Sequence, residues 1–499
     1  MPDSTLLSDD VRADIQGFIA SGYGHLSHAA YLFVQLHDAA AARGWLQQLG
    51  PDVQSARAWP VVDGRVVKPS AALNIAFTAP GLAALGLPAQ VLCTFPPEFR
   101  EGMAEPTRSR ILGDTEESDP DGWELGGTRT PAIHAVVVLH AASVQGLDVL
   151  CREQRALIEG ARGGVTELPG AMQSGYRPDG DHEPFGFHDG VSQPAVAGLT
   201  GDGVPTGEFI LGYPNHFAVV PPSPVVPAEL DRQNVLPPVV KPHRGARPFR
   251  DLGINGSYVV YRKLQQDVAG FWSFMTREAA RDGRENAGRA IELAARCVGR
   301  WPSGAPLVLA SAADDPADGN RDDFLYGGDP DGLACPLGAH IRRANPRDGL
   351  KPYSATQSLS MSEAHRLLRR ARVFGPALFD PSVLRSLAMT GSGASALNRP
   401  AEDIARGIHF FCVNASIKRQ FEFVQQTWCN NPRFNGLHDN KDPILGDNAR
   451  VGQPSSHMII PDWPVRRRTG ALPRFVSVRG GAYLFMPGLS ALRFLAAEG

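Results

Sequence analysis

The chain has 499 residues, 43% of them hydrophobic and 20% charged, with a formal net charge of −3 at neutral pH. This length exceeds what one ordinary core holds, so two domains are expected, and the composition is that of a globular protein with ample core material. The small negative charge, with no basic cluster interleaved with aromatic residues, argues against a nucleic-acid partner.

Cysteine spacing and the N-terminal sequence bear on the compartment. The six cysteines form no C-x-x-C pair, which argues against a zinc site or a disulfide framework and fits a reducing compartment. The first residues, MPDSTLLSDDVRADIQ, are acidic and lack the apolar segment of a signal peptide, and no apolar run reaches 18 residues. We therefore expect a cytoplasmic protein with no membrane partner.

In the first half of the chain, strand-like and helix-like segments alternate. Residues 31–36 (YLFVQL) predict a strand, and residues 38–49 an alanine-rich helix with Trp45 on its apolar side. After a long excursion, residues 133–141 (IHAVVVLHA) are rich in β-branched residues and predict a second strand, followed by a helix.

The second half repeats this order. Residues 258–264 and 408–414 predict strands, each followed by a helix, over residues 265–275 and 415–428. A doubled strand–helix unit of this kind predicts an α+β fold of two ferredoxin-like domains, each an antiparallel sheet with helices on one face. The proline-rich stretch 221–250 is where the chain is expected to pass from a first domain (1–235) to a second (236–499).

A glycine-punctuated loop, residues 183–196 (EPFGFHDGVSQPAV), carries the carboxylate Asp189 between Gly186 and Gly190. Glycines allow the backbone a positive φ or a close approach to a flat group, so the carboxylate can be aimed at a cavity. On these residues alone, a structural turn with an Asx hydrogen bond is the favoured interpretation.

Three motifs carry a resemblance to a known family. GFHDG resembles the G-x-x-D-G signature of dye-decolorising haem peroxidases, residues 335–347 (CPLGAHIRRANPR) resemble the segment with that family's proximal histidine, and residues 366–375 (RLLRRARVFG) resemble the segment with its distal arginine. Further stretches resemble the long-chain branch of the family, so that nearly the whole chain is covered: 110–126, 207–214, 406–428 and 475–491. The resemblance implies two ferredoxin-like domains arranged as in a dimeric α+β barrel, with haem b held between them.

The resemblance implies that His340 is the axial ligand of the haem iron, since iron takes a neutral imidazole nitrogen. A ligand histidine needs a hydrogen-bond acceptor behind its other ring nitrogen. Family placement favours Glu422 for this role, although a surface pair of Glu422 with Lys418 is an equally weighted alternative.

The resemblance also implies that Asp189 and Arg369 act on hydrogen peroxide, the carboxylate by moving a proton and the guanidinium by stabilising negative charge. Counting back from Gly375 selects Arg369, while Arg370 and Arg372 are expected on a solvated helix end. His188 stands where the family commonly has an apolar residue, and we expect it to face away from the pocket.

The remaining cofactor contacts are expected around these residues. Arg342 is predicted to pair with a haem propionate. Gly190 and Ser192 are predicted to lie against the haem edge or offer backbone donors. Phe374 either packs over the haem or is a plain core aromatic.

These residues predict a haem peroxidase that reacts with hydrogen peroxide through an oxyferryl intermediate and oxidises dyes, phenols and aromatic amines. The alternative is a haem-handling protein that carries, stores or strips iron from haem with little turnover, which would need His340 but not Asp189 and Arg369. We expect a monomer or homodimer.

Overall fold

The computed structural model describes residues 6–239, 248–280, 286–391, 393–400, 402–452 and 454–497. The expected inter-domain connection, residues 221–250, lies partly outside these ranges, because residues 240–247 are not described. Its described part carries strand β8 (Val225–Pro227), which pairs with β9 (Phe249–Asp251), so the stretch holds some regular structure despite its prolines. The domain boundary itself stays a prediction.

The first half forms an antiparallel unit of five strands around β1 (His28–Leu36). Strand β1 pairs with β5 (Ala135–Ala141) on one side, and on the other with β6 (Val165–Glu167) and β7 (Gln173–Tyr176), while β4 (Ala71–Phe77) pairs with β5. Helices α3 (Ala39–Leu49) and α8 (Val144–Gly160) follow β1 and β5. Each is preceded by a capping residue, Asp38 and Ser143 respectively, whose side chain accepts a hydrogen bond from an amide of the first turn.

The second half repeats this arrangement around β10 (Ser257–Gln266). Strand β10 lies between β13 (Gly407–Asn414) and β16 (Val476–Met486), and β13 also pairs with the short strands β11 (Leu368–Arg369) and β12 (Arg372–Phe374). Helix α9 (Val268–Ala279) follows β10, and a π-helical stretch, Lys418–Glu422 and Val424–Cys429, follows β13.

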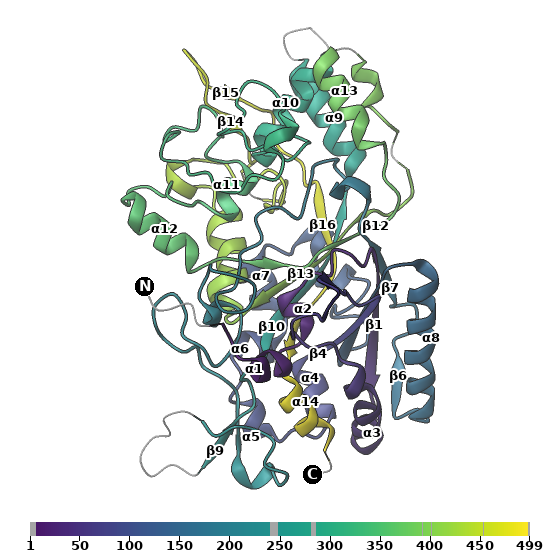
Figure 1. Ribbon diagram of the computed structural model, residues 1–499. Coiled ribbons are helices and arrows are strands. Elements are labelled where there is room, and N and C mark those ends of the chain that lie inside the picture. The colour runs from purple at the N-terminus through teal and green to yellow at the C-terminus, as the bar shows by residue number, and fades with distance from the viewer. Residues whose placement is uncertain are drawn as a thin grey trace.

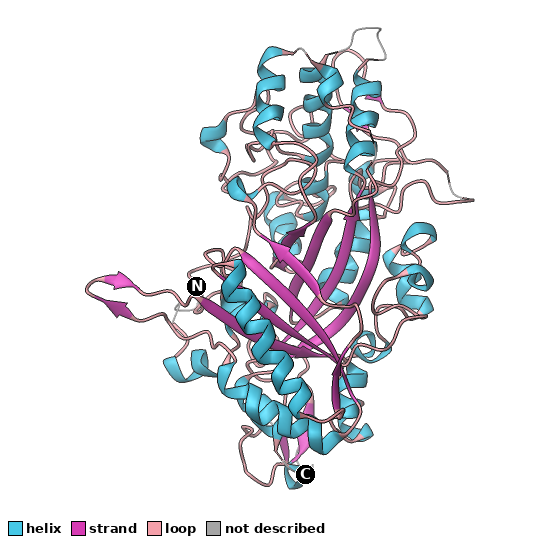
Figure 2. Cartoon of the chain, turned by 90° about the vertical axis from the view of Figure 1, so that its right-hand side faces the viewer, coloured by secondary structure: helices cyan, strands magenta, loops and turns pink. Residues whose placement is uncertain are grey.

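The two units join into one closed sheet. Its strand order is β10-β16-β4-β5-β1-β7-β12-β13, and pairing of β10 with β13 completes the ring. The seams between the halves are narrow: Phe485 with Phe77 on one side and Val373 with Tyr176 on the other. The strands lie side by side in the middle of the molecule with helices outside them (Figure 2). The predicted α+β fold of two ferredoxin-like units is confirmed.

Both faces of the strands are buried, which explains their nearly continuous apolar runs. Inside the ring, alternate side chains pack together, among them Phe33, Tyr261 and Phe411. The side chains between them, such as Leu32 and Val34, pack under the outer helices with Trp45 and Trp272. The two tryptophans occupy equivalent places after β1 and β10 and are at most 1% exposed.

The other elements lie around this ring, with α10 and α13 at the top of Figure 1 and α11 and α12 to the left of the strands. No described helix has both the length and the apolar character to cross a bilayer. The remaining helices and strands are α1 (Asp9–Asp14), α2 (Gly17–Ala20), β2 (Val61–Val62), β3 (Arg65–Val66), α4 (Ala79–Ala84), α5 (Ala89–Leu92), α6 (Pro97–Glu101), α7 (Pro106–Leu112), α10 (Ala287–Val298), α11 (His340–Ala344), α12 (Ala355–Glu363), α13 (Pro381–Thr390), β14 (Ile459–Ile460), β15 (Arg467–Arg468) and α14 (Leu489–Ala496).

Candidate active site

A cavity of about 280 Å³ lies against the outer face of the second unit's strands. Residues of β10, β13 and β16 form its floor, and α11 and the loops 183–192 and 444–447 form its walls. The floor is mainly apolar, with Leu264, Ile408, Phe410, Val476 and Val478. Both halves of the chain contribute, because the 183–192 loop and residues 112–118 belong to the first half.

His340 begins helix α11 and lines the cavity. Its Nδ1 lies 2.9 Å from Oδ2 of Asp442, whose side chain is fully buried. The other carboxylate oxygen of Asp442 accepts the amides of Ile444 (2.8 Å) and Leu445 (2.9 Å). Although burial opposes ionisation, His340 and the Leu445 amide hold the pKa of Asp442 below its usual value. An ionised acceptor at Nδ1 leaves Nε2 as the unprotonated nitrogen.

The prediction that Glu422 stands behind His340 is therefore wrong, and Asp442 occupies that place. Glu422 instead accepts from Arg108 Nη1 and from the hydroxyl of Tyr483, both at 2.9 Å. The alternative pair with Lys418 is not formed either, because Glu422 points into the interior beside Tyr483 and is 2% exposed.

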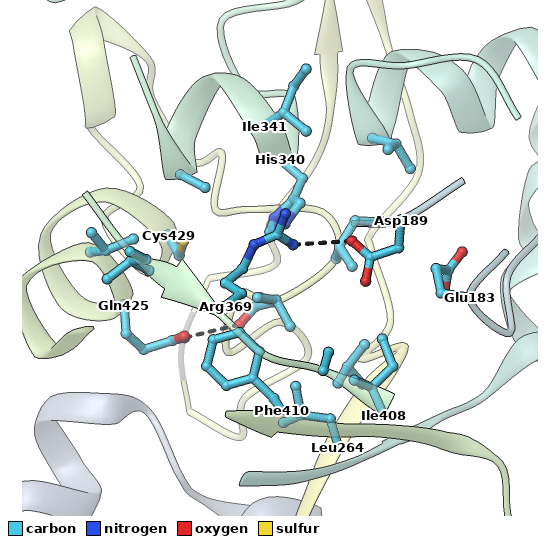
Figure 3. Close-up of a pocket in the computed structure, with 18 of the residues that line it drawn as sticks. Glu183, Asp189, Leu264, His340, Ile341, Arg369, Ile408, Phe410, Gln425 and Cys429 are labelled. Carbon is cyan, nitrogen blue, oxygen red and sulfur yellow. Dashed lines mark hydrogen bonds and ion pairs between the residues drawn. The ribbon is translucent and has the colours of Figure 1, made fainter. Parts of the chain in front are cut away.

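Asp189 and Arg369 form an ion pair on the cavity wall, with Nη1 3.1 Å from Oδ1 (Figure 3). Nη2 of Arg369 also donates to the carbonyl of Val191 at 2.9 Å, so the guanidinium is tied to the loop at two points. Both side chains are about 30% exposed, Arg369 30% and Asp189 31%. The two residues singled out 180 positions apart thus meet at one cavity.

Strand alternation decides which arginine faces the cavity. Arg369 and Ala371 line it, whereas Arg370, Arg372 and Phe374 point to the other side. Arg370 donates to the carbonyls of Phe18 and Ile19, and Arg372 to those of Gly22, Tyr23 and Leu26. The expectation of a solvated helix end was wrong, since Arg372 lies in β12, Arg370 lies between β11 and β12, and both side chains are buried.

Two predicted cofactor contacts do not face the cavity. Arg342 is 1% exposed and bonds to Asp329 (3.0 Å) and the carbonyl of Cys335 (2.6 Å). It stands two positions after His340 on a helix, about 200° around the axis, so it points away when His340 points in. Phe374 packs on His409, with ring centroids 4.8 Å apart, and is a core aromatic.

Backbone hydrogen bonds hold the loop at Asp189 and at the residue before it. The amide of Asp189 donates to the Asp181 carbonyl (2.7 Å) and that of His188 to the Pro302 carbonyl (3.0 Å). His188 belongs to the cavity wall, against the expectation that it faces away. Gly190 has φ of 85°, and a Cβ added there would meet no atom within 4 Å. Ser192 lines the cavity and bonds to Asp322 and to Arg300.

Arginines other than Arg342 supply the positive charge that lines the cavity. Arg300, Arg347 and Arg366 line it beside Arg369. Arg347 is paired with Asp322, whereas Arg366 forms no ion pair with another described residue. Burial lowers the pKa of Arg366 in spite of the nearby Asp322. A partly buried cation of this kind favours an anionic group of a ligand.

Comparison with known proteins shows to which family the chain belongs. The chain is 32% identical to a dye-decolorising peroxidase of Exidia glandulosa, over 96% of this chain and 86% of that protein. It is also 32% identical to a multifunctional dye peroxidase of an Amycolatopsis species, over 93% and 91%. The chain belongs to the dye-decolorising peroxidase family. It is accordingly a DyP-type peroxidase, an enzyme of a haem-dependent family.

Solved structures agree with this assignment. An ancestral D-type dye-decolorising peroxidase superposes with a TM-score of 0.75 at 27% identity, covering 99% of this chain and all of that one. A mutant of the peroxidase of Auricularia auricula-judae superposes with a TM-score of 0.74 at 27% identity, over 97% and 99%. No family model matches the chain.

Sequence reasoning missed two residues that line this peroxidase's cavity, Arg366 and Glu183, and it missed Asp442 behind His340. Asp442 precedes a proline and two apolar residues (DPIL), a pattern that places its side chain against the following amides. That signal marks a turn and does not reveal a histidine 102 positions away. Arg366 lay inside the segment that was recognised but has no distinguishing spacing.

Proposed function

We propose that the cavity holds haem b with His340 as the iron ligand, and that Asp189 and Arg369 are the pair that acts on hydrogen peroxide. One observation carries this proposal: a histidine with a buried carboxylate behind it and a carboxylate–guanidinium pair line the same cavity. Figure 3 places His340, Arg369 and Asp189 around one space.

The residues present fit haem. A bare Nε2 on His340 suits iron, and the apolar floor suits a porphyrin. Gly190 is exposed and is not among the residues that line the cavity, so its contact with the haem edge stays a prediction. Arg366, which has no ion-pair partner among the described residues, offers a guanidinium for a propionate, the role that the family resemblance had suggested for Arg342. Among the described residues, no group of three or more histidine, cysteine or acidic side chains could hold a metal ion by itself.

The Asp189–Arg369 pair gives the cavity its acid–base chemistry. An ionised Asp189 takes a proton from one oxygen of peroxide and returns it to the other as the O–O bond breaks. Arg369 keeps its charge throughout and donates hydrogen bonds to the oxygen that becomes negative. The Val191 carbonyl contact holds the guanidinium in place while Asp189 changes protonation. Haem, when bound, supplies the iron redox chemistry that converts peroxide into an oxidant.

Aromatic compounds are the proposed reductants. One solved relative is a dye-decolorising peroxidase in complex with 2,6-dimethoxyphenol, and this chain covers 99% of it at 26% identity. Phenols, aromatic amines and dyes are therefore the substrate class we infer here. A cytoplasmic location and a monomer or homodimer complete the proposal, the former supported by six unpaired cysteines, five of them buried.

The test is stopped-flow absorption of the haem-reconstituted protein mixed with hydrogen peroxide, for wild type and Asp189→Asn. Wild type should bind haem and react rapidly, and the variant should bind haem equally but react about 100-fold more slowly or worse. Haem binding without reaction in wild type would favour a haem-handling protein, which has no use for the Asp189–Arg369 pair. Failure to bind haem would overturn the proposal.

A further inference from the structure

A second carboxyl group, Glu183, lines the same cavity from the start of the loop that carries Asp189 (Figure 3). Its Oε1 accepts the amide of Phe187 at 3.0 Å, and its Oε2 accepts the amide of Phe185 at 3.0 Å. Oε2 also accepts Nε2 of Gln266 on β10 at 2.7 Å. The Glu183 side chain thus fixes the turn whose last residue stands two positions before Asp189.

All three partners are hydrogen-bond donors, so they favour the ionised carboxylate. Burial acts in the opposite direction and raises the pKa of Glu183 to about 7, and the charge of Asp189 adds to the rise. The two forms of Glu183 are therefore nearly balanced at neutral pH. A protonated Glu183 must turn one oxygen from acceptor to donor, which removes at least one of the three hydrogen bonds.

Gln266 offers the acceptor that the neutral form needs. Its Oε1 is buried and has no hydrogen-bond partner, while its Nε2 holds Glu183. A half-turn of the amide exchanges the two atoms and brings Oε1 to the carboxyl group. Buried acceptors without partners are uncommon and costly, so an unpaired one beside a titrating acid calls for an explanation.

We propose that Glu183 and Gln266 are a two-state positioning pair for Asp189. In one state an ionised Glu183 accepts from Gln266 and both loop amides. In the other a neutral Glu183 donates from Oε2 to the turned Gln266, and the protonated Oε2 becomes a weaker acceptor for the Phe185 amide. The loop holds Asp189 firmly only in the first state. This inference rests on the proposed function, because it concerns how the same cavity is regulated.

The titratable and charged groups that face this pair come from the loop itself and from β11. On its own loop, Glu183 shares the cavity with His188 and Asp189, and across the cavity β11 contributes Arg369. Helix α9 contributes the uncharged Trp272, which donates to the Phe185 carbonyl at 3.1 Å. Strand β10 presents Gln266 and Leu264, and the residue of β16 paired with Gln266 is the apolar Val476.

The first test is infrared spectroscopy of the ferric holoprotein labelled with ¹³C-glutamate. A protonated-carboxyl band should disappear between pH 5.5 and pH 8.5 in wild type and be missing at both values in Glu183→Gln. Glu422→Gln is the matched control, because Glu422 is also buried with a pKa raised by burial but does not line the cavity. If wild type shows no protonated-carboxyl band that titrates in this range, the proposal is overturned, and this result does not depend on any variant folding.

The second test is the pH profile of the reaction with hydrogen peroxide. Glutamine at position 183 copies the neutral state, since its amide can accept from the loop and donate to Gln266. The variant should react at the wild-type low-pH rate at every pH between 5.5 and 8.5. Wild type should become roughly fivefold faster across neutrality, the effect expected for one hydrogen bond.

The outcomes separate this inference from the proposed function. A Glu183→Gln protein that binds haem, reacts with peroxide and keeps the wild-type transition near pH 7 would refute the pair and leave the peroxidase intact. A protein that does not bind haem fails the proposed function, whereas the carboxyl band of Glu183 can still be measured.

Discussion

His340, with Asp442 behind it, and the Asp189–Arg369 pair meet at one cavity, but the two pairs are built differently. Asp442 is fully buried and receives three hydrogen bonds, two of them from amides of its own turn. Asp189 and Arg369 are each about 30% exposed and come from a loop and a two-residue strand. A buried, saturated acceptor fixes the direction of a ligand atom, whereas a half-exposed pair can exchange protons with water and substrate.

The difference shows which of the two pairs is held rigidly. Removal of a buried, paired group leaves an unsatisfied partner and costs stability. Removal of a half-exposed group costs little stability because water replaces the lost contact. We therefore expect haem binding to depend on the first pair and peroxide chemistry on the second.

The largest effect should follow from His340→Ala. Without its imidazole ligand the cavity keeps only apolar contacts and arginines, so haem affinity should fall by about 100-fold or more. Haem titration followed by the Soret band measures this. His438→Ala, at an exposed histidine outside the cavity, should bind haem as wild type does; equal affinity of both variants would contradict the assignment.

A smaller effect, confined to chemistry, is expected for Arg369→Lys. An ammonium group cannot reach Asp189 and the Val191 carbonyl with the planar geometry of a guanidinium, so the reaction with peroxide should slow by about 100-fold. Haem affinity and melting temperature should stay near wild type. Arg370→Lys, one residue along, should show the reverse, a lower melting temperature with the peroxide rate retained, because Arg370 is buried under backbone carbonyls.

Asp442→Asn should weaken haem retention by about tenfold, since a neutral acceptor makes His340 a poorer donor to iron. The measurement is haem transfer to an excess of apomyoglobin. Glu422→Gln is the control that decides between the two acids: if it releases haem faster than Asp442→Asn does, the hydrogen bond to Asp442 is not the important one.

The smallest effect concerns stability and pH at Glu183. The pKa of Glu183 is raised from 4.5 to about 7 in the folded protein. Its contribution to the free energy of unfolding is therefore complete below pH 4.5 and is lost as the pH rises through 7. Relative to Glu183→Gln, wild type should lose on the order of 1 to 2 kcal/mol between pH 4.5 and pH 8, after allowance for water in the cavity. Urea unfolding across this range measures it; a difference independent of pH would exclude the shifted carboxyl.

Much of the fold was predictable, because the information is local. Apolar runs such as residues 133–141 specify buried strands whatever the tertiary context. Trp45 and Trp272 lie on the equivalent helices α3 and α9, and both are buried. The local pattern did not reveal that the two sheets close into one ring through two seams of one residue pair each.

For the site, the amino-acid sequence supplied the motifs, and the tertiary structure decided the partners. Resemblance to the family's motifs selects His340, Asp189 and Arg369, because each lies within a short segment that resembles one of them. The acceptor behind His340 stands 102 positions away, where neither period nor motif reaches, and only folding shows that it is Asp442. The direction of Arg342 and Phe374 depends on helix phase and strand alternation, and those follow only once one residue of each element is known to face the cavity.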